Sequence, residues 1–68
     1  MVHVDSEAIL DIDYDAAAAT LHVRFTSGDG YSYFDVPADV HRAFVAAQSH
    51  GRFFQQHIRD RYRYRKVG

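Results

Sequence analysis

The stretch "TLHVRFTSGDGYSYFDVP", Thr20–Pro37, decides the fold because it contains two strand-like segments, the turn between them and the start of a helix. Leu21, Val23 and Phe25 alternate with polar residues, which is the period of a half-buried strand. The segment "TSGDG" places two glycines around an aspartate, as turns that need a positive φ do. The sequence therefore predicts a β-hairpin, followed by a helix whose first turn contains Pro37.

The second strand of this hairpin, residues 31–36, is predicted to place its purely apolar residues, Phe34 and Val36, in the core. Tyr31 and Tyr33 then point to the opposite face, two residues apart on one side of the strand. Such a pair of rings on an open sheet face either binds a partner or reflects only the high strand propensity of tyrosine.

Upstream, the segment from Ala8 to Tyr14 is predicted to be the first strand, because Leu10, Ile12 and Tyr14 alternate with acidic residues. Its carboxylates, Asp11 and Asp13, are expected on the open face. The run "DAAAA", Asp15–Ala19, joins the first two strands. Because so short a run cannot nucleate a helix, we expect a hairpin loop there.

Two short helices are expected after the third strand. Val40, Phe44 and Ala47 form a stripe at i, i+4 and i+7, which is typical of an amphipathic helix ending near Gln48. Ser49 can cap a second helix. This second helix is predicted to contain Phe53, Phe54, His57 and Ile58.

The C-terminal segment "RYRYRK", Arg61–Lys66, interleaves cations with rings. If it is extended, its arginines lie on one side and Tyr62 and Tyr64 on the other. It forms either a fourth strand or an extended tail, and as a tail its tyrosines would cover the open sheet face. The partners of its arginines are either a polyanion or aspartates of the same chain: Asp11, Asp13 and Asp39.

These elements predict an α+β fold, with a three-stranded antiparallel β-meander followed by two helices packed on one face and a possible C-terminal strand. With 68 residues, the chain has room for one domain, residues 1–68, around one small core. The predicted core residues are Leu10, Ile12, Leu21, Val23, Phe25, Phe34, Val36, Val40, Phe44, Phe54 and Ile58.

Charge is distributed unevenly along the chain, although the formal net charge is only -1. Residues 1–40 contain eight acidic side chains and a single basic one, Arg24. Residues 41–68 contain seven basic side chains and a single acidic one, Asp60. The basic end can bind a polyanion even when the whole chain is near neutral, and it can equally bind the acidic half of its own fold.

The open face of the predicted sheet has the composition of a nucleic-acid-binding surface. His22 and Arg24 project from the strand next to the two tyrosines. Exposed rings stack on unpaired bases, at ~1–3 kcal/mol per base, while arginine contacts phosphate. The candidate nucleic-acid-binding residues are Tyr31, Tyr33, His22, Arg24, Arg61, Tyr62, Arg63, Tyr64, Arg65 and Lys66.

The sequence lacks the patterns of several other kinds of site. The five histidines include no pair at i, i+4, and there is no cysteine, so we expect neither a metal nor a cofactor. Ser27 and Ser49 lack a nucleophile-elbow context, and cross-strand charge pairing accounts for an aspartate near His22, so we expect no enzyme. No segment approaches the ~20 apolar residues of a membrane span, and we expect a cytoplasmic protein without a membrane partner.

The order of these segments resembles that of the KTSC domain, found at the C-terminus of some lysyl-tRNA synthetases and as a stand-alone bacterial protein. The resemblance begins at "SEAILDIDYD" (Ser6–Asp15) and continues through "TLHVRF", "YSYFDVP" and "SHGRFFQQHIRDRYRYR". The Tyr-x-Tyr that marks the family falls on Tyr31 and Tyr33. The resemblance implies no catalytic residue, and the attachment to a synthetase implies an RNA partner, with tRNA as one candidate.

We therefore expect a small non-enzymatic module that binds RNA through the tyrosine pair and the basic C-terminal segment. The alternative is a protein-interaction or homo-oligomerisation module that uses the same surface, because tyrosine and arginine are also enriched at protein interfaces.

Overall fold

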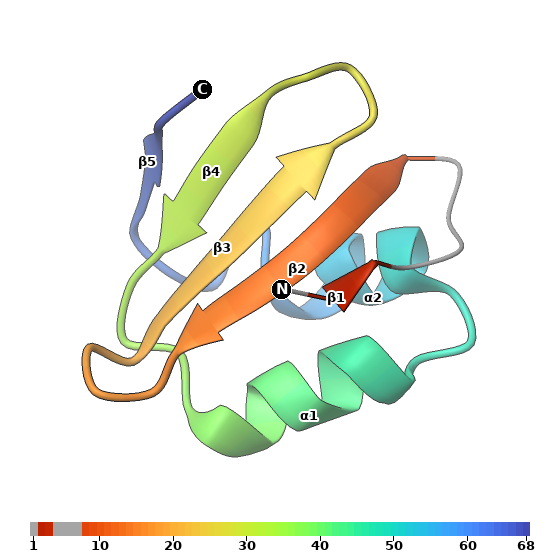
Figure 1. Ribbon diagram of the computed structural model, residues 1–68. Coiled ribbons are helices and arrows are strands. Elements are labelled where there is room, and N and C mark those ends of the chain that lie inside the picture. The colour runs from red at the N-terminus through yellow and green to blue at the C-terminus, as the bar shows by residue number, and fades with distance from the viewer. Residues whose placement is uncertain (1, 4–7) are drawn as a thin grey trace.

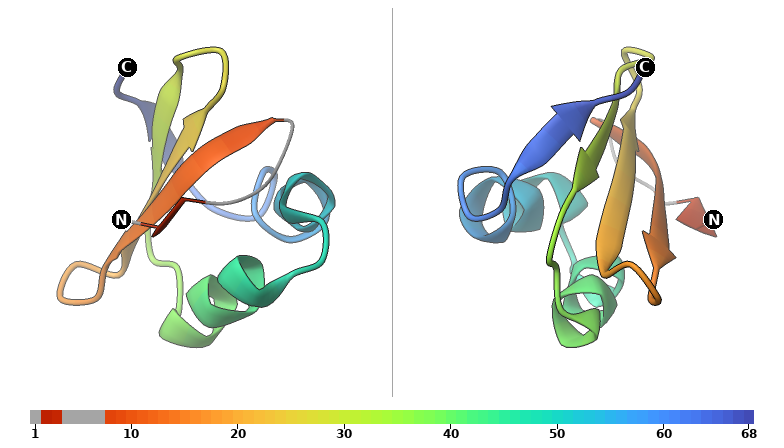
Figure 2. Two further views of the ribbon diagram at one scale, coloured as in Figure 1. Left: turned by 45° about the vertical axis from the view of Figure 1, so that its right-hand side comes forward. Right: turned by 90° about the vertical axis from the view of Figure 1, so that its left-hand side faces the viewer.

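The computed structural model describes residues 2–3 and 8–68, with side chains from Ala8 onward. Within these residues the strands form one antiparallel sheet in the order β1-β2-β3-β4-β5, and both helices lie on one side of it (Figures 1 and 2). This arrangement confirms the predicted α+β fold. The elements are β1 (Val2–His3), β2 (Ile9–Asp15), β3 (Thr20–Phe25), β4 (Gly30–Tyr33), α1 (Ala38–Ala46), α2 (His50–His57) and β5 (Tyr64–Lys66).

Both predicted hairpin loops are confirmed. In the loop between β2 and β3, the backbone N–H of Ala18 donates to the Asp15 carboxylate at 3.3 Å, and Ala19 has a φ of 51°. In the turn between β3 and β4, Gly28 has a φ of 98°, and its N–H donates to the Phe25 carbonyl at 2.9 Å. This is the positive φ for which glycine is suited.

The register of β2 corrects the prediction for Leu10. Ile9 pairs with Phe25, but the next pair is Asp11 with Arg24, so Leu10 is an extra residue in a β-bulge. The bulge places Ile9 in the core and leaves Leu10 42% exposed. Beyond the bulge the alternation resumes, and Asp11 and Asp13 lie on the face away from the helices, as predicted.

The register of β4 corrects the predicted direction of the two tyrosines. Tyr31 pairs with Val23 and Tyr33 with Leu21, and directly opposed residues share a face, so both tyrosines point toward the helices. The prediction was wrong because alternation was extended backward from Val36.

The alternation breaks at Asp35, whose φ of 58° lies in the left-handed region. This single residue turns Val36 back into the core, where it is fully buried. Phe34 is only half-buried and lies on the outer face, so its predicted place in the core was also wrong.

The two helices follow the sequence closely. α1 ends at Ala46, slightly before the predicted end at Gln48. The Ser49 hydroxyl accepts a hydrogen bond from the backbone N–H of Arg52 at 3.3 Å, which confirms it as the cap of α2. Among residues 2–3 and 8–68, neither helix combines the length and apolar character needed to cross a bilayer. The buried core consists of Ile9, Ile12, Leu21, Val23, Tyr33, Val36, Phe44, Phe54 and Ile58.

The C-terminal segment forms a strand and does not lie over a sheet face. β5 pairs antiparallel with β4, placing Tyr64 opposite Tyr33, Arg65 opposite Ser32 and Lys66 opposite Tyr31. It is the edge strand of the sheet, at the end opposite β1 (Figure 1). Of the two predicted alternatives for this segment, the fourth strand of the meander is the correct one.

Candidate functional site

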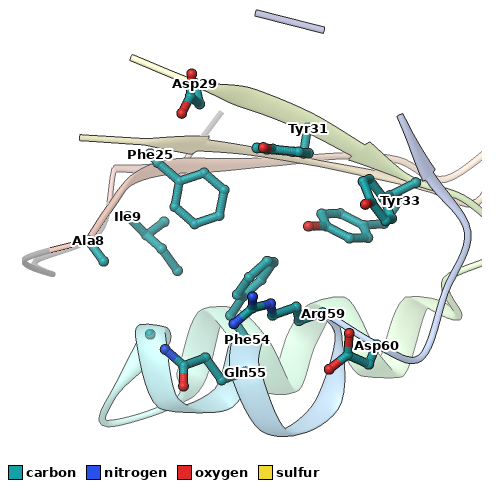
Figure 3. A pocket seen from close by; sticks show the side chains of 12 residues that line it. Ala8, Ile9, Phe25, Asp29, Tyr31, Tyr33, Phe54, Gln55, Arg59 and Asp60 are labelled. Carbon is teal, nitrogen blue, oxygen red and sulfur yellow. The ribbon is translucent and has the colours of Figure 1, made fainter. Parts of the chain in front are cut away.

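A cavity of about 490 Å³ lies between the sheet and α2, and the Tyr-x-Tyr pair forms part of its wall. Figure 3 shows the sheet residues above this cavity and the residues of α2 below it. We call it the aromatic pocket. Its lining residues are Ala8, Ile9, Phe25, Asp29, Tyr31, Tyr33, Gly51, Phe54, Gln55, Arg59, Asp60 and Tyr64.

Four rings of the aromatic pocket form a closed cycle of contacts. The Phe25 centroid lies 5.7 Å from that of Tyr31 and 5.2 Å from that of Phe54. The Tyr33 centroid lies 6.4 Å from that of Tyr31 and 5.5 Å from that of Phe54. Three of these contacts are edge-to-face, with interplanar angles of 76° to 82°, an arrangement favoured by the quadrupoles of the rings. The ring contacts therefore hold the walls of the pocket in place.

The three tyrosines become progressively more exposed toward the edge of the sheet. Tyr33 is 4% exposed, Tyr31 is half-buried, and Tyr64 on β5 is 60% exposed. The Tyr64 centroid lies 5.9 Å from that of Tyr31 and 5.7 Å from that of Tyr33. The three rings thus form a continuous aromatic surface from the core to solvent.

Burial also changes the acidity of the innermost tyrosine. Desolvation, together with the neighbouring Tyr31 and Tyr64 hydroxyls, raises the pKa of Tyr33 to about 12. Its hydroxyl therefore stays protonated, and remains a hydrogen-bond donor, to a higher pH than that of an ordinary tyrosine.

The rim of the aromatic pocket carries polar groups without protein partners. In the described part of the chain, no hydrogen bond or ion pair engages the side chains of Gln55, Arg59 or Asp60, all at the α2 side. Asp29 differs, because it forms an ion pair with Lys66 at 3.4 Å. The rim thus offers a ligand the Arg59 guanidinium as a donor, the Asp60 carboxylate as an acceptor and the Gln55 amide as both.

The outer face of the sheet, away from the helices, carries a different set of groups. His22 Nδ1 lies 2.7 Å from Ser32 Oγ, and Ser32 is buried. The Arg63 guanidinium lies 5.5 Å from the centroid of the Phe34 ring and pairs with Asp35 at 3.2 Å.

The structure divides the candidate residues between two faces that meet at β5. Tyr31, Tyr33, Tyr64 and Lys66 lie on the helix side, whereas His22, Arg24 and Arg65 lie on the outer side. Tyr62 precedes β5 and packs against the core. In the described part of the chain, Arg61 and Arg65 have no ion-pair partner, and Arg63 pairs with Asp35 rather than with Asp11, Asp13 or Asp39.

Sequence reasoning missed the other half of the aromatic pocket. Phe25 and Phe54 were assigned to the core, and Arg59 and Asp60 were not assigned to any site. Their proximity to the tyrosines could not be inferred, because the tyrosines were placed on the opposite face. Across the residues that the structure describes, no group of three histidine or carboxylate side chains is arranged to hold a metal ion, and the His3 side chain lies outside them.

Comparison with known proteins identifies close relatives along almost the whole chain. The chain is 41% identical over 63 residues to a protein of Tsukamurella paurometabola, which covers 93% of this chain and 94% of that protein. The crystal structure of a KTSC domain protein from Yersinia pestis is similar with a TM-score of 0.94 and 38% identity, over 97% of this chain and 93% of that chain.

Part of a longer protein also matches. A lysine–tRNA ligase of Trichormus variabilis is 32% identical over 59 residues, which are 87% of this chain and 10% of the ligase. The family model of the KTSC domain matches residues 5–62, a range that includes β2 to α2 and most of the aromatic pocket. With this match and relatives of nearly equal length, the chain belongs to the KTSC domain family.

Proposed function

We propose that this chain is a small, non-enzymatic, single-domain module that binds single-stranded RNA along its β5 edge. The observation that carries the proposal is the position of Tyr64. Its exposed ring extends the aromatic surface of Tyr31 and Tyr33 to solvent, and arginines flank it in the sequence on both sides.

The alternation of β5 places different groups on its two sides, which suits contacts to both bases and phosphates. Tyr64 and Lys66 point to the pocket side and Arg65 to the outer side, as their cross-strand partners show. An RNA strand running along this edge would stack a base on Tyr64 while arginines contact phosphates on either side. Base stacking on aromatic residues beside cations is a general mode of binding single strands.

The relatives support RNA as the class of partner. A lysine–tRNA ligase contains a segment similar to most of this chain, and that enzyme is named for a reaction on tRNA. We therefore include tRNA among the candidate ligands and propose a cytoplasmic location without a cofactor.

Fluorescence anisotropy with a labelled single-stranded RNA and with a tRNA, at several salt concentrations, tests this proposal. Tyr64→Ala should weaken binding by about 5- to 150-fold, because one stacked base contributes ~1–3 kcal/mol. Arg65→Gln should lower the slope of log K against log salt by about 0.7, the value for one phosphate contact on a single strand. Arg42→Gln makes the same charge change on the exposed surface of α1 and should alter neither quantity.

Two results would overturn the RNA module. One is the absence of binding by the wild-type chain at low salt and sub-millimolar protein concentration. The other is wild-type affinity and salt slope in both Tyr64→Ala and Arg65→Gln.

A homo-oligomer formed through β5 is the alternative use of this edge. The exposed Tyr64 and the neighbouring Val67, which is 58% exposed, favour a contact between proteins. Antiparallel pairing of two β5 strands would, however, bring the arginines of both copies close together, and charged edge strands oppose such pairing. A dimer seen by light scattering and abolished by Tyr64→Ala would favour this alternative.

A further inference from the structure

We infer that the aromatic pocket takes one unstacked guanine of the bound RNA, with Asp60 and Arg59 contacting its edge. This inference rests on the proposed function and adds to it a site for one particular base, which adjoins the β5 edge at Tyr64.

The size and walls of the pocket suit a planar ring. Its volume of about 490 Å³ lies within the ~300–1,000 Å³ of small-molecule sites. Phe25 and Tyr33 each contact both Tyr31 and Phe54, so the four rings form one continuous aromatic wall of the cavity, three from the sheet and Phe54 from α2 (Figure 3). A planar base would stack on the face of one of these rings, with the edges of the neighbouring rings against it.

The charges around the pocket select against another class of ligand. An aromatic box can also hold an alkylated ammonium ion, through cation–π attraction. Here Arg59 lies at the rim, and Lys66 neutralises the Asp29 carboxylate at 3.4 Å. With the arginines of the β5 edge close by, the electrostatic environment favours a neutral ring attached to phosphate over an organic cation.

The unpartnered rim groups distinguish guanine from the other bases. An ionised carboxylate such as that of Asp60 only accepts hydrogen bonds, and guanine is the RNA base with two adjacent donors, N1–H and the exocyclic amino group, on its Watson–Crick edge. Adenine and cytosine place an acceptor beside their amino group, and uracil has one donor between two carbonyls. The Arg59 guanidinium matches the O6 and N7 acceptors of guanine, the pairing that arginine uses to read this base in nucleic acids.

The test uses four mononucleotides, GMP, AMP, CMP and UMP, titrated separately into the isotope-labelled chain and followed by NMR. GMP should shift the ring signals of Tyr31 and Phe54 and bind about tenfold or more tightly than the other three, because a bidentate contact discriminates to this degree. Asp60→Asn should reduce GMP affinity about tenfold and leave AMP affinity unchanged. Asp39→Asn, an equal charge change at an exposed position of α1, should leave all four affinities unchanged.

Equal shifts with all four nucleotides, no shift of the Tyr31 and Phe54 rings, or unchanged GMP affinity in Asp60→Asn would overturn the inference. Equal affinity for RNAs with and without guanine, bound at the β5 edge, would overturn it while the RNA module stands. GMP binding in the pocket without binding of any RNA would overturn the RNA module and leave a guanine nucleotide site. Selective shifts with choline, used as a cationic probe, would assign the pocket to an ammonium ligand and overturn the inference.

Discussion

At the scale of single residues, Ala19 carries backbone strain that a substitution can relieve. Its φ of 51° lies in the left-handed region, where the Cβ atom of an L-residue clashes with the backbone. Glycine has no Cβ atom and adopts this region without that clash. We expect Ala19→Gly to raise the free energy of unfolding by about 0.5–1 kcal/mol, measured by urea denaturation. Ala17→Gly in the same loop, where φ is not positive, should give no gain. Equal effects in the two variants would contradict the strain argument.

The raised pKa of Tyr33 makes stability depend on pH in the alkaline range. The folded chain holds this proton up to a pKa of about 12, whereas the unfolded chain releases it near the ordinary tyrosine pKa of 10.0. Between these values the native state binds more protons than the unfolded state, so stability falls as pH rises. This contribution is fully present below pH 10 and is lost as pH rises through about 12.

Urea unfolding at stepped alkaline pH, with Tyr33→Phe as the control, measures this loss. Because phenylalanine cannot ionise, we expect the variant to lose less stability than the wild type across that interval. Absorbance at 295 nm should show one of the five tyrosines titrating last, and this last titration step should be missing in the variant. Parallel pH dependence in the two chains would refute the assignment.

Single residues also explain where sequence reasoning failed. Alternation is a local rule, and it correctly placed Leu21 and Val23 in the core. The extra residue Leu10 and the left-handed Asp35 each shift the alternation by one position. Side chains beyond such a residue therefore point to the face opposite to the one that simple alternation predicts. A non-glycine residue with positive φ leaves no reliable mark in the sequence, so the direction of the tyrosine pair could not be predicted from it.

At the scale of elements, two glycines allow a matched comparison. Gly51 lies within α2, has no positive φ, and would place an added Cβ in open space. Because glycine is a poor helix former, we expect Gly51→Ala to raise the free energy of unfolding by about 0.5–1 kcal/mol. Gly28→Ala should instead lower it, because a φ of 98° strains any residue with a side chain. Thermal melting of both variants checks the prediction, and a loss of stability in Gly51→Ala would contradict it.

The elements that sequence reasoning identified correctly are those with their own chemical signals. The loop turns, the capping serine and the amphipathic stripe of α1 are properties of a few neighbouring residues. The aromatic pocket is different, since it depends on β4, β5 and α2 meeting in space. The candidate residues on β4 and β5 were therefore found, whereas Phe54, Gln55 and Arg59 were not recognised as their neighbours.

At the scale of the whole molecule, the charge asymmetry along the sequence becomes a charge asymmetry across the sheet. Because the strand order follows the chain order, acidic β2 and basic β5 are separated by β3 and β4. Asp11 and Asp13 therefore lie away from Arg65 of β5, whereas Arg63, just before β5, pairs with Asp35 and Lys66 pairs with Asp29. Within residues 8–68, Arg61 and Arg65 have no ion-pair partner, so the basic end is only partly paired with the acidic half of the chain.

The stability of the whole fold depends on a small number of buried rings, of which Phe44 is the clearest case. It is fully buried, and its centroid lies 5.5 Å from that of Phe53 and 6.4 Å from that of Phe54. Phe44→Ala should lower the free energy of unfolding by ~3–5 kcal/mol through lost burial and the cavity left behind. Because native domains are stable by only ~5–15 kcal/mol, and this one is small, we expect a large unfolded fraction at 37 °C.

The control for this prediction is Phe34→Ala, which removes the same ring from a half-buried position on the outer face. Its loss should be clearly smaller, because water already reaches that ring and its removal leaves no closed cavity. Urea unfolding of both variants, with the slope m compared with the wild type, separates a loss of native stability from a change in compactness. If Phe44→Ala cost no more than Phe34→Ala, the core described for α1 and α2 would be wrong, and with it the wall that α2 gives to the aromatic pocket.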